Sequence, residues 1–268
     1  MVNVPVFFLS IKWKVLQIVS KGKTKHKLSS CEKHYKQLHS KSGLILTASF
    51  RSKIGRSHSV SHNFISDFET WIGVLSGRLE GSLLKSALRE YQFALLALAQ
   101  GQYRQSFMAL RLFLELALSS IYFSANELEL REWLKGQKDI AWNSLVDLDK
   151  GVFSKRFVRA FYEGLADEAP HYGTIAAAVY RECSEFVHGN ALTHDALPAT
   201  LTFAEDVFTD WHAKALSVRL VVVFALCARY LKDLKDNDHK LLEPHVIDSL
   251  GHIPAIRTIF GGVTEAKE

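Results

Sequence analysis

Apolar side chains recur every three to four residues over most of the segment from residue 67 to residue 235. This spacing places them on one face of an α-helix, where they can be buried against other helices. The strict apolar–polar alternation of a half-buried strand is scarce in the same segment. Because 48% of the chain is hydrophobic and 23% is charged, the composition suits a folded core. The sequence therefore predicts an all-α fold, an up-and-down helical bundle.

Capping residues and glycines mark where the predicted helices begin and end. Asp67 is placed as the N-cap of the first helix, and Gly101 ends its apolar pattern. The segment 103–124 is apolar on almost every side, which indicates a helix in the centre of a bundle. Gly189 is well placed to terminate the helix expected at 171–188. The remaining helices are expected at 127–135, 143–147, 154–166, 206–234 and 244–250.

Positive charge is concentrated at one end of the sequence. The whole chain carries 33 Lys and Arg against 28 Asp and Glu, for a net charge of +5. Residues 1–60 hold twelve of the basic residues and one acid, Glu32, so the rest of the chain is net negative. This imbalance indicates an arm or small module that binds a polyanion. We therefore expect a basic N-terminal extension (1–62), a helical bundle (63–236) and a C-terminal tail with a short helix (237–268).

Two structures are compatible with the basic extension. Apolar runs at 4–11, 15–19 and 44–48 favour strands, and therefore a small sheet or hairpin. The alternative is a weakly ordered arm. In either form, a cluster of lysines would contact the backbone of RNA without reading its sequence: Lys21, Lys23, Lys25 and Lys27.

Histidines in the same extension raise the question of a metal. Cys31 and His34 form a Cys-x2-His pair, and His58 and His62 form a His-x3-His pair. Tetrahedral zinc accepts nitrogen and sulfur ligands of this kind. The spacer between the pairs is long and the region is rich in histidine, so zinc is the weaker interpretation. We expect no metal and no cofactor.

Cysteine usage and hydropathy bear on location. The three cysteines are odd in number and far apart, which favours a reducing compartment over a disulfide scaffold. The most apolar run, 220–228, is shorter than the roughly 20 residues needed to span a bilayer. Lys12 and Lys14 follow the apolar N-terminal stretch where a signal peptide would have small residues. We expect a cytoplasmic protein that does not associate with membranes.

Four common enzyme motifs are absent from the sequence: the Walker A loop, the GxGxxG fingerprint, the GxSxG nucleophile elbow and the HExxH zinc motif. Gly261 and Gly262 lack the Lys-Ser/Thr that would complete a phosphate loop. The sequence therefore gives no support to the enzyme classes that depend on these motifs.

The most informative stretch is Tyr-Arg-Glu-Cys-Ser-Glu-Phe-Val-His-Gly-Asn, residues 180–190. Arg181 and His188 are seven residues apart, so on an α-helix they share one face, two turns from each other. Arginine is a permanent cation whose planar fork can hold a phosphate, and histidine can exchange a proton near neutral pH. Cleavage of RNA through its own 2′-hydroxyl needs such a pair. The base removes the hydroxyl proton, and the cation stabilises charge on the phosphorus. No metal is required.

This Arg-x6-His spacing, at the end of a late helix in an all-α bundle, resembles the Arg-x4–6-His motif of the HEPN superfamily. The amino-acid sequence of residues 180–189 is especially similar to that of the Abi- and Apea-type defence members of the superfamily. The earlier stretch 103–115 (YRQSFMALRLFLE) resembles the helix that packs beside the motif helix in such bundles. The likeness covers roughly residues 66–235 and does not reach the basic extension.

The resemblance implies an endoribonuclease that acts as a homodimer, with two motifs facing each other across a two-fold axis. It also implies a role in antiviral defence or a toxin-like stress response, with a cognate antitoxin or defence-system partner. Arg181 and His188 would be the catalytic pair.

Neighbouring polar residues are candidates for supporting roles in this site. Glu182 stands where the family often has Asn, Asp or His, and it would repel a phosphate unless it orients Arg181 or His188. Ser184 and Glu185 are expected to line the cleft. Asn190 occupies the position of a tyrosine found in one toxin subgroup, so regulation through that tyrosine does not carry over.

Glu115 has two interpretations. Arg111 and Glu115 are four apart in an apolar helix and are most simply an intrahelical ion pair. Alternatively, Glu115 reaches across to hold Arg181.

A non-catalytic function is the alternative to the nuclease. In that case the same HEPN-like bundle dimerises, senses a ligand or docks a partner. Glu182 would then mark a pocket that is no longer suited to cleavage.

Overall fold

The computed structural model describes residues 29–51, 54–188 and 191–262. All the regular secondary structure in this part of the chain is helical, and it contains no strand. The predicted all-α class is therefore confirmed. The elements are α1 (Ser30–Arg51), α2 (Gly55–Val74), α3 (Gly81–Ala99), α4 (Tyr103–Phe123), α5 (Glu127–Leu134), α6 (Trp142–Leu145), α7 (Lys155–Tyr162), η1 (Glu163–Leu165), α8 (Ala169–Glu185), α9 (Ala191–Ala196), α10 (Glu205–Tyr230), η2 (Leu231–Asp233), α11 (Asp236–Leu250) and α12 (Pro254–Ile259).

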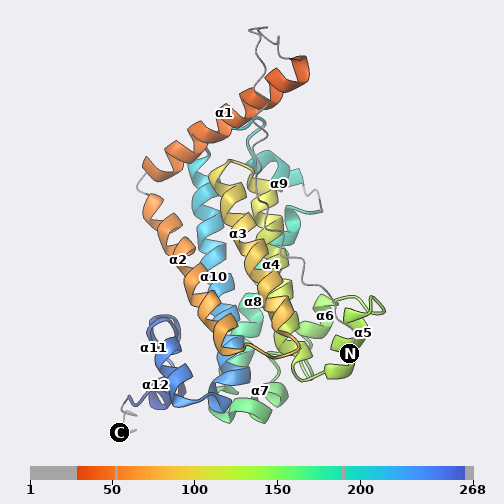
Figure 1. Cartoon of the computed structure of the whole chain (residues 1–268), viewed down its shortest axis with the longest axis vertical. Coiled ribbons are helices and arrows are strands. Elements are labelled where there is room, and N and C mark those ends of the chain that lie inside the picture. The colour runs from red at the N-terminus through yellow and green to blue at the C-terminus, as the bar shows by residue number, and fades with distance from the viewer. Residues whose placement is uncertain (1–28, 52–53, 189–190, 263–268) are drawn as a thin grey trace, which may run out of the picture.

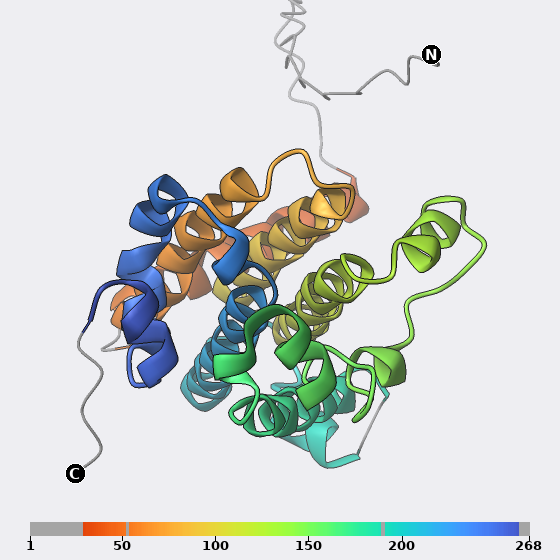
Figure 2. The same ribbon diagram turned by 90° about the horizontal axis from the view of Figure 1, so that it is seen from below.

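Helix α10 is the centre of the bundle, surrounded by α2, α4, α7 and α8 (Figure 2). Every residue from Val221 to Leu231 is buried. A helix that is apolar on all sides belongs in such a position. Helix α4, which the sequence predicts to be central, packs along α3 and also contacts α8 and α10. Burial of these apolar faces is the main stabilising contribution to the fold.

The turn between α3 and α4 depends on Gly101. Its φ angle is +76°, a conformation that favours glycine. A Cβ atom at this position would also lie 2.7 Å from Cδ1 of Ile45 in α1. The predicted helix end at Gly101 is therefore correct. The same glycine lets α1 approach the α3–α4 turn closely.

The N-terminal extension differs from the prediction. Leu44 to Ala48, expected as a strand, lie inside α1, and α2 runs straight through the expected boundary between residues 62 and 63. Asp67 lies within α2 and does not cap a helix. The physical reason is burial at helical spacing. Ile45 and Ser49, four residues apart, are buried at the end of the bundle, and α2 has a continuous buried face.

The C-terminal segment also differs from the predicted tail. The short helix expected at 244–250 is the second half of the longer α11, which contains Pro244. Three side chains of α11, those of Leu242, Val246 and Leu250, are fully buried in the same hydrophobic core as the bundle. Helix α11 packs against α2 and α10. Residues 237–262 are therefore part of the folded unit.

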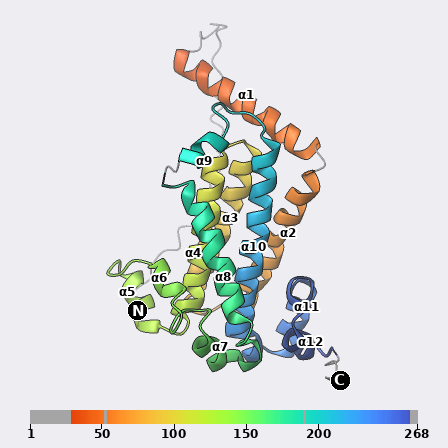
Figure 3. The same ribbon diagram turned by 180° about the vertical axis from the view of Figure 1, so that it is seen from behind.

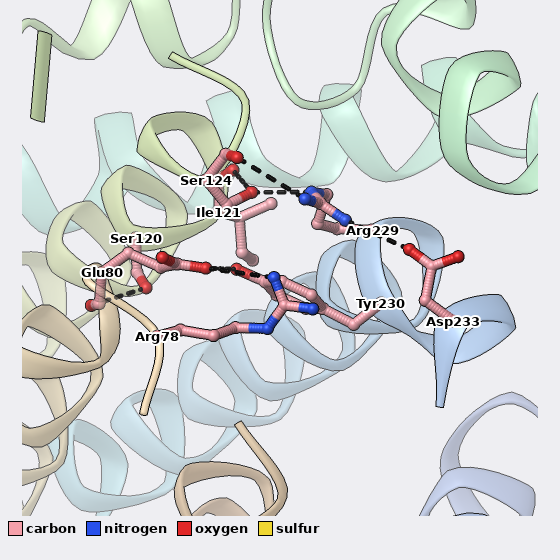
Figure 4. A network of polar contacts seen from close by, with 8 residues as sticks. All are labelled: Arg78, Glu80, Ser120, Ile121, Ser124, Arg229, Tyr230 and Asp233. Carbon is pink, nitrogen blue, oxygen red and sulfur yellow. Dashed lines mark hydrogen bonds and ion pairs between the residues drawn. The ribbon is translucent and has the colours of Figure 1, made fainter. Parts of the chain in front are cut away.

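A polar network joins three parts of the bundle at the end remote from α1 (Figure 4). The hydroxyl of Tyr230 donates to Oε1 of Glu80 at 3.0 Å, and Ser120 donates to the carbonyl of Glu80 at 3.2 Å. Arg229, which is 9% exposed, donates through Nε to the hydroxyl of Ser124 at 2.7 Å. The guanidinium groups of Arg78 and Arg229 lie 4.9 and 4.8 Å from the centre of the Tyr230 ring. The network ties the α2–α3 loop and α4 to the end of α10.

In the described part of the chain, α4 is the one helix long and apolar enough to cross a membrane. Of the window that meets this criterion, 67% is buried inside the protein. Its apolar surface is therefore mostly used in packing against the other helices.

Candidate functional site

Helix α8 positions Arg181 and His188 at the end of the bundle that also holds α9 and α1 (Figure 3). Pro170 lies in the first turn of α8, where the missing amide hydrogen costs nothing. After Glu185 the backbone continues to turn, because the amide of His188 donates to the carbonyl of Ser184 at 3.1 Å. The two side chains thus remain about two turns apart on one side of the helix.

Both members of the pair are exposed to solvent. Within the described residues, the side chains of Arg181 and His188 make no hydrogen bond or ion pair, and neither residue lines one of the larger cavities. Side chains sealed in structural contacts could not act on a substrate. The exposure of these two leaves the guanidinium and the imidazole accessible to a ligand.

Tyr180, the residue before Arg181, faces a neighbouring side of α8 and is held there by contacts with α4 and α6. Its hydroxyl donates to Oε1 of Glu115 at 2.8 Å and also contacts Arg111. Its ring lies flat against Trp142, with ring centres 3.6 Å apart and an angle of 4° between planes. Burial is the main cause that raises the pKa of Tyr180, so the hydroxyl stays protonated and keeps donating.

Glu115 thus pairs with Arg111, its first expected partner, and does not contact Arg181, its second. Nη2 of Arg111 lies 3.2 Å from Oε1 of Glu115, four residues along α4. The structure brings Glu115 to Tyr180 rather than to Arg181. Glu115 therefore influences Arg181 only through the placement of α8.

Glu182 turns toward α10. Its carboxylate lies 3.0 Å from Nζ of Lys214, which also binds Asp210 at 2.7 Å. Burial opposes the charge on Lys214, but the hydrogen bonds to Asp210 and Glu182 outweigh it and raise the pKa of the ammonium group. Since Lys214 remains charged, it offsets part of the negative charge that Glu182 and Asp210 would present to a phosphate.

The other supporting candidates are placed less favourably. The hydroxyl of Ser184 donates to the carbonyl of Tyr180 at 2.7 Å, so it is used within α8 and does not reach toward Arg181. Glu185 is half-buried. Asn190 lies outside the described residues. The structure therefore brings Arg181 and His188 to one surface without assembling the supporting residues around them.

Two residues that sequence reasoning missed fix the end of α8. Nη1 of Arg104 donates to the carbonyl of Phe186 at 3.1 Å. The ring of Phe107 stacks on that of Phe186, with centres 3.8 Å apart and an angle of 6°. Both contacts are made with Phe186, which lies two residues before His188. Their signal in the sequence is spacing, since the residues of α4 that touch α8 share one helical face: Arg104, Phe107, Arg111 and Glu115.

A cavity of about 580 Å³ lies beside this end of α8. It is lined by Leu38 and Ser42 of α1, by the first turn of α4, and by residues 197–201 between α9 and α10. Arg104 lines the cavity and bonds to Phe186, so it connects the cavity wall to the segment that carries His188.

The remaining predicted residues do not form a site. Lys21, Lys23, Lys25 and Lys27 lie outside the described residues. The zinc candidates are not brought together, because Cys31 and His34 are exposed on α1 whereas His58 is buried against Phe208. No group of three or more His, Cys, Asp or Glu in the described ranges could hold a metal ion.

Comparison with known protein families, with curated proteins and with solved structures finds no match to this chain. The resemblance to the HEPN superfamily therefore stays a prediction from the sequence motif.

Proposed function

We propose that this chain is an endoribonuclease of HEPN type, with Arg181 and His188 as its catalytic residues. The single observation that carries the proposal is the exposure of a guanidinium on α8 and of an imidazole in the turn that continues it, neither of them paired among the described residues. Arg181 lies on the helix itself, and the backbone of His188 is held to it by the hydrogen bond to Ser184.

The chemistry follows from these two groups. The imidazole of His188 accepts the proton of a ribose 2′-hydroxyl, and the resulting oxygen attacks the adjacent phosphorus. Arg181 binds the non-bridging oxygens, on which charge accumulates in the transition state. The bond from phosphorus to the 5′-oxygen breaks, and that oxygen takes a proton from water or from the imidazole of a second subunit. The products are a 2′,3′-cyclic phosphate and a 5′-hydroxyl.

The arrangement around the pair supports this role. The ion pair between Glu182 and Lys214 reduces the repulsion that an isolated glutamate would exert on phosphate. Tyr180 and Phe186 are anchored by α4 on either side of the motif, so α8 has a defined position. A single Arg–His pair supplies one base and one cation. A homodimer that faces two pairs toward each other would supply the acid as well.

The biological role that we propose is antiviral defence or a toxin-like stress response in the cytoplasm, with an antitoxin or defence-system partner that restrains cleavage. The test is incubation of the purified protein with total RNA in the presence of a chelator, followed by analysis of the fragment ends. Fragments that end in 2′,3′-cyclic phosphate support the proposal. Intact RNA, combined with a stable dimer in sedimentation, would favour the non-catalytic dimerisation module.

A further inference from the structure

Helix α1 lies across the end of the bundle and touches it along one side only (Figure 1). Ile45 and Ser49 are the buried residues of α1, and Ile45 packs against Gly101 at the α3–α4 turn. Most of the other side chains of α1 are exposed. A helix of 22 residues is about 33 Å long. It presents a long surface to solvent.

This exposed surface is positively charged. Helix α1 carries Lys33, Lys36, Lys41 and Arg51 and a single acid, Glu32. Glu32 lies 2.9 Å from Lys36, and the other three cations have no ion pair within the described residues. The helical repeat places Lys33, Lys36 and Arg51 on the side away from Ile45 and Ser49, with Lys41 at the flank. These cations are available to an external anion.

The structure also connects α1 to the proposed active site. Leu38 and Ser42 of α1 line the same cavity of about 580 Å³ as Arg104. Arg104 in turn donates to the carbonyl of Phe186, two residues before His188. One cavity therefore separates the cationic helix from the end of α8. A strand that follows α1 would be delivered close to the motif.

We propose that α1 is the helix that binds the RNA backbone and guides the strand toward Arg181 and His188. This inference rests on the proposed function, because it takes the bound polyanion to be the RNA substrate. Lysine and arginine that face solvent bind phosphates without reading sequence. Tyr35 is 66% exposed beside Lys36, so its ring offers a surface on which a base can stack.

The distribution of apolar residues favours RNA over an anionic membrane. A helix that lies in a membrane surface presents a continuous apolar face to the lipid. The exposed large apolar residues in the second half of α1 are Leu44, Leu46 and Phe50. At helical spacing Leu44 lies on one flank and Leu46 and Phe50 on the other, with Lys36 facing outward between Leu44 and Phe50, so they do not form one continuous apolar face. Phe50 packs edge-on against His58. The outward side thus suits phosphates better than acyl chains.

The test measures binding separately from cleavage. The full-length chain carries His188→Ala throughout, and the probe is a labelled single-stranded oligouridine at several salt concentrations. One variant adds Lys33→Gln, Lys41→Gln and Arg51→Gln. The matched control adds Lys85→Gln, Lys235→Gln and Lys240→Gln, which remove three exposed cations outside α1. Circular dichroism and thermal unfolding show whether both variants remain folded.

We expect the α1 variant to bind at least tenfold more weakly at low salt, and its salt slope to fall by about 2, since each lost contact to a single strand accounts for about 0.7. The control should change less than threefold. Equal losses in both variants, or no binding by the parent protein, would overturn the inference. So would loss of binding to phosphatidylserine vesicles with RNA affinity unchanged. If the α1 variant loses binding but unmodified protein never cleaves RNA, the RNA-binding role of α1 stands, whereas the nuclease proposal and the delivery of the strand to Arg181 and His188 fall.

Discussion

Arg104 donates a hydrogen bond of 3.1 Å to the carbonyl of Phe186, and this bond joins the first turn of α4 to the end of α8. The last carbonyls of a helix have no partner within it, so a donor from another helix satisfies one of them. Because His188 follows two residues later, the position of the imidazole depends on a contact made by a residue far away in the sequence.

Replacement of Arg104 by methionine should loosen the end of α8. The substitution removes the donor and keeps an apolar side chain of similar length, and a hydrogen bond from a charged group contributes about 1.5–3 kcal/mol. Since Arg104 is only half-buried, we expect a loss of about 1–2 kcal/mol in the free energy of unfolding. Hydrogen exchange at the amides of Val187 and His188 should accelerate. Unchanged exchange at these amides would show that Arg104 does not hold the segment.

Gly101→Ala should destabilise the protein by about 1–3 kcal/mol, because alanine is strained at positive φ. Its Cβ would also press on Ile45 and displace α1. Gly73→Ala is the matched control, since nothing lies within 4 Å of a Cβ at that position in α2. There, alanine should be neutral or stabilise by up to about 1 kcal/mol. Urea unfolding measures both, and an equal effect of the two substitutions would contradict this account of the turn.

Tyr230→Phe tests the polar network at the other end of the bundle. Burial, followed by the charge of Glu80, raises the pKa of Tyr230, so the phenol donates its proton to the carboxylate over the whole physiological range. Loss of the hydroxyl removes one hydrogen bond from the carboxylate of Glu80, a residue that is only 6% exposed. We expect a cost of about 1–3 kcal/mol. In the background of Glu80→Gln the same substitution should cost less, and additive effects would show that the two groups are not coupled.

Acid should destabilise the fold through two buried histidines, His58 and His212. Burial lowers the pKa of His58 to about 4 and that of His212 to about 3, from an ordinary value of 6.5. The nearby charges of His62 and of Arg219 act in the same direction. The hydroxyl of Ser61 hydrogen-bonds to Nδ1 of His212 at 2.8 Å.

Between these pKa values and 6.5, the unfolded chain binds more protons than the folded one, so stability falls as the pH falls below about 6.5. At pH 5 each histidine should cost about 2 kcal/mol. His58→Phe should flatten the pH dependence of unfolding by urea, whereas His171→Ala, at an exposed position, should not. If both variants retain the slope of the parent protein, the acid sensitivity has another source.

The sequence predicts the helices that bury much apolar surface and misses the one that does not. Helices α4, α8 and α10 have apolar residues at helical spacing because they pack on several neighbours, and this periodicity is visible in one dimension. Helix α1 buries only Ile45 and Ser49, and most of its other residues are polar, so it has few apolar residues to mark it as a helix that packs in the bundle. Its short apolar run then looks like a strand. Similarly, α11 follows a charged stretch, and its three buried residues are too few to reveal its full length.

The candidate site also has one part that the sequence predicts and one part that it does not. The shared face of Arg181 and His188 follows from local helix geometry, which depends only on their separation in sequence. The contacts of Arg104 with Phe186 and of Glu115 with Tyr180 depend on how α4 packs against α8, and no local pattern specifies that pairing. The bond between Glu182 and Lys214 requires α10 to lie beside α8. Supporting residues are therefore visible only in the folded chain.

The central claim is tested most directly by cleavage of a defined single-stranded RNA in the presence of chelator. The comparison includes the unmodified chain, Arg181→Ala, His188→Ala and the control His171→Ala, which replaces an exposed histidine at the other end of α8. Removing a general base or a charge-stabilising cation typically slows a reaction by 10²-fold or more. We predict that Arg181→Ala and His188→Ala each lose at least about 99% of the cleavage rate and remain folded, while His171→Ala retains it. Cleavage at the same rate by all four proteins would contradict the assignment.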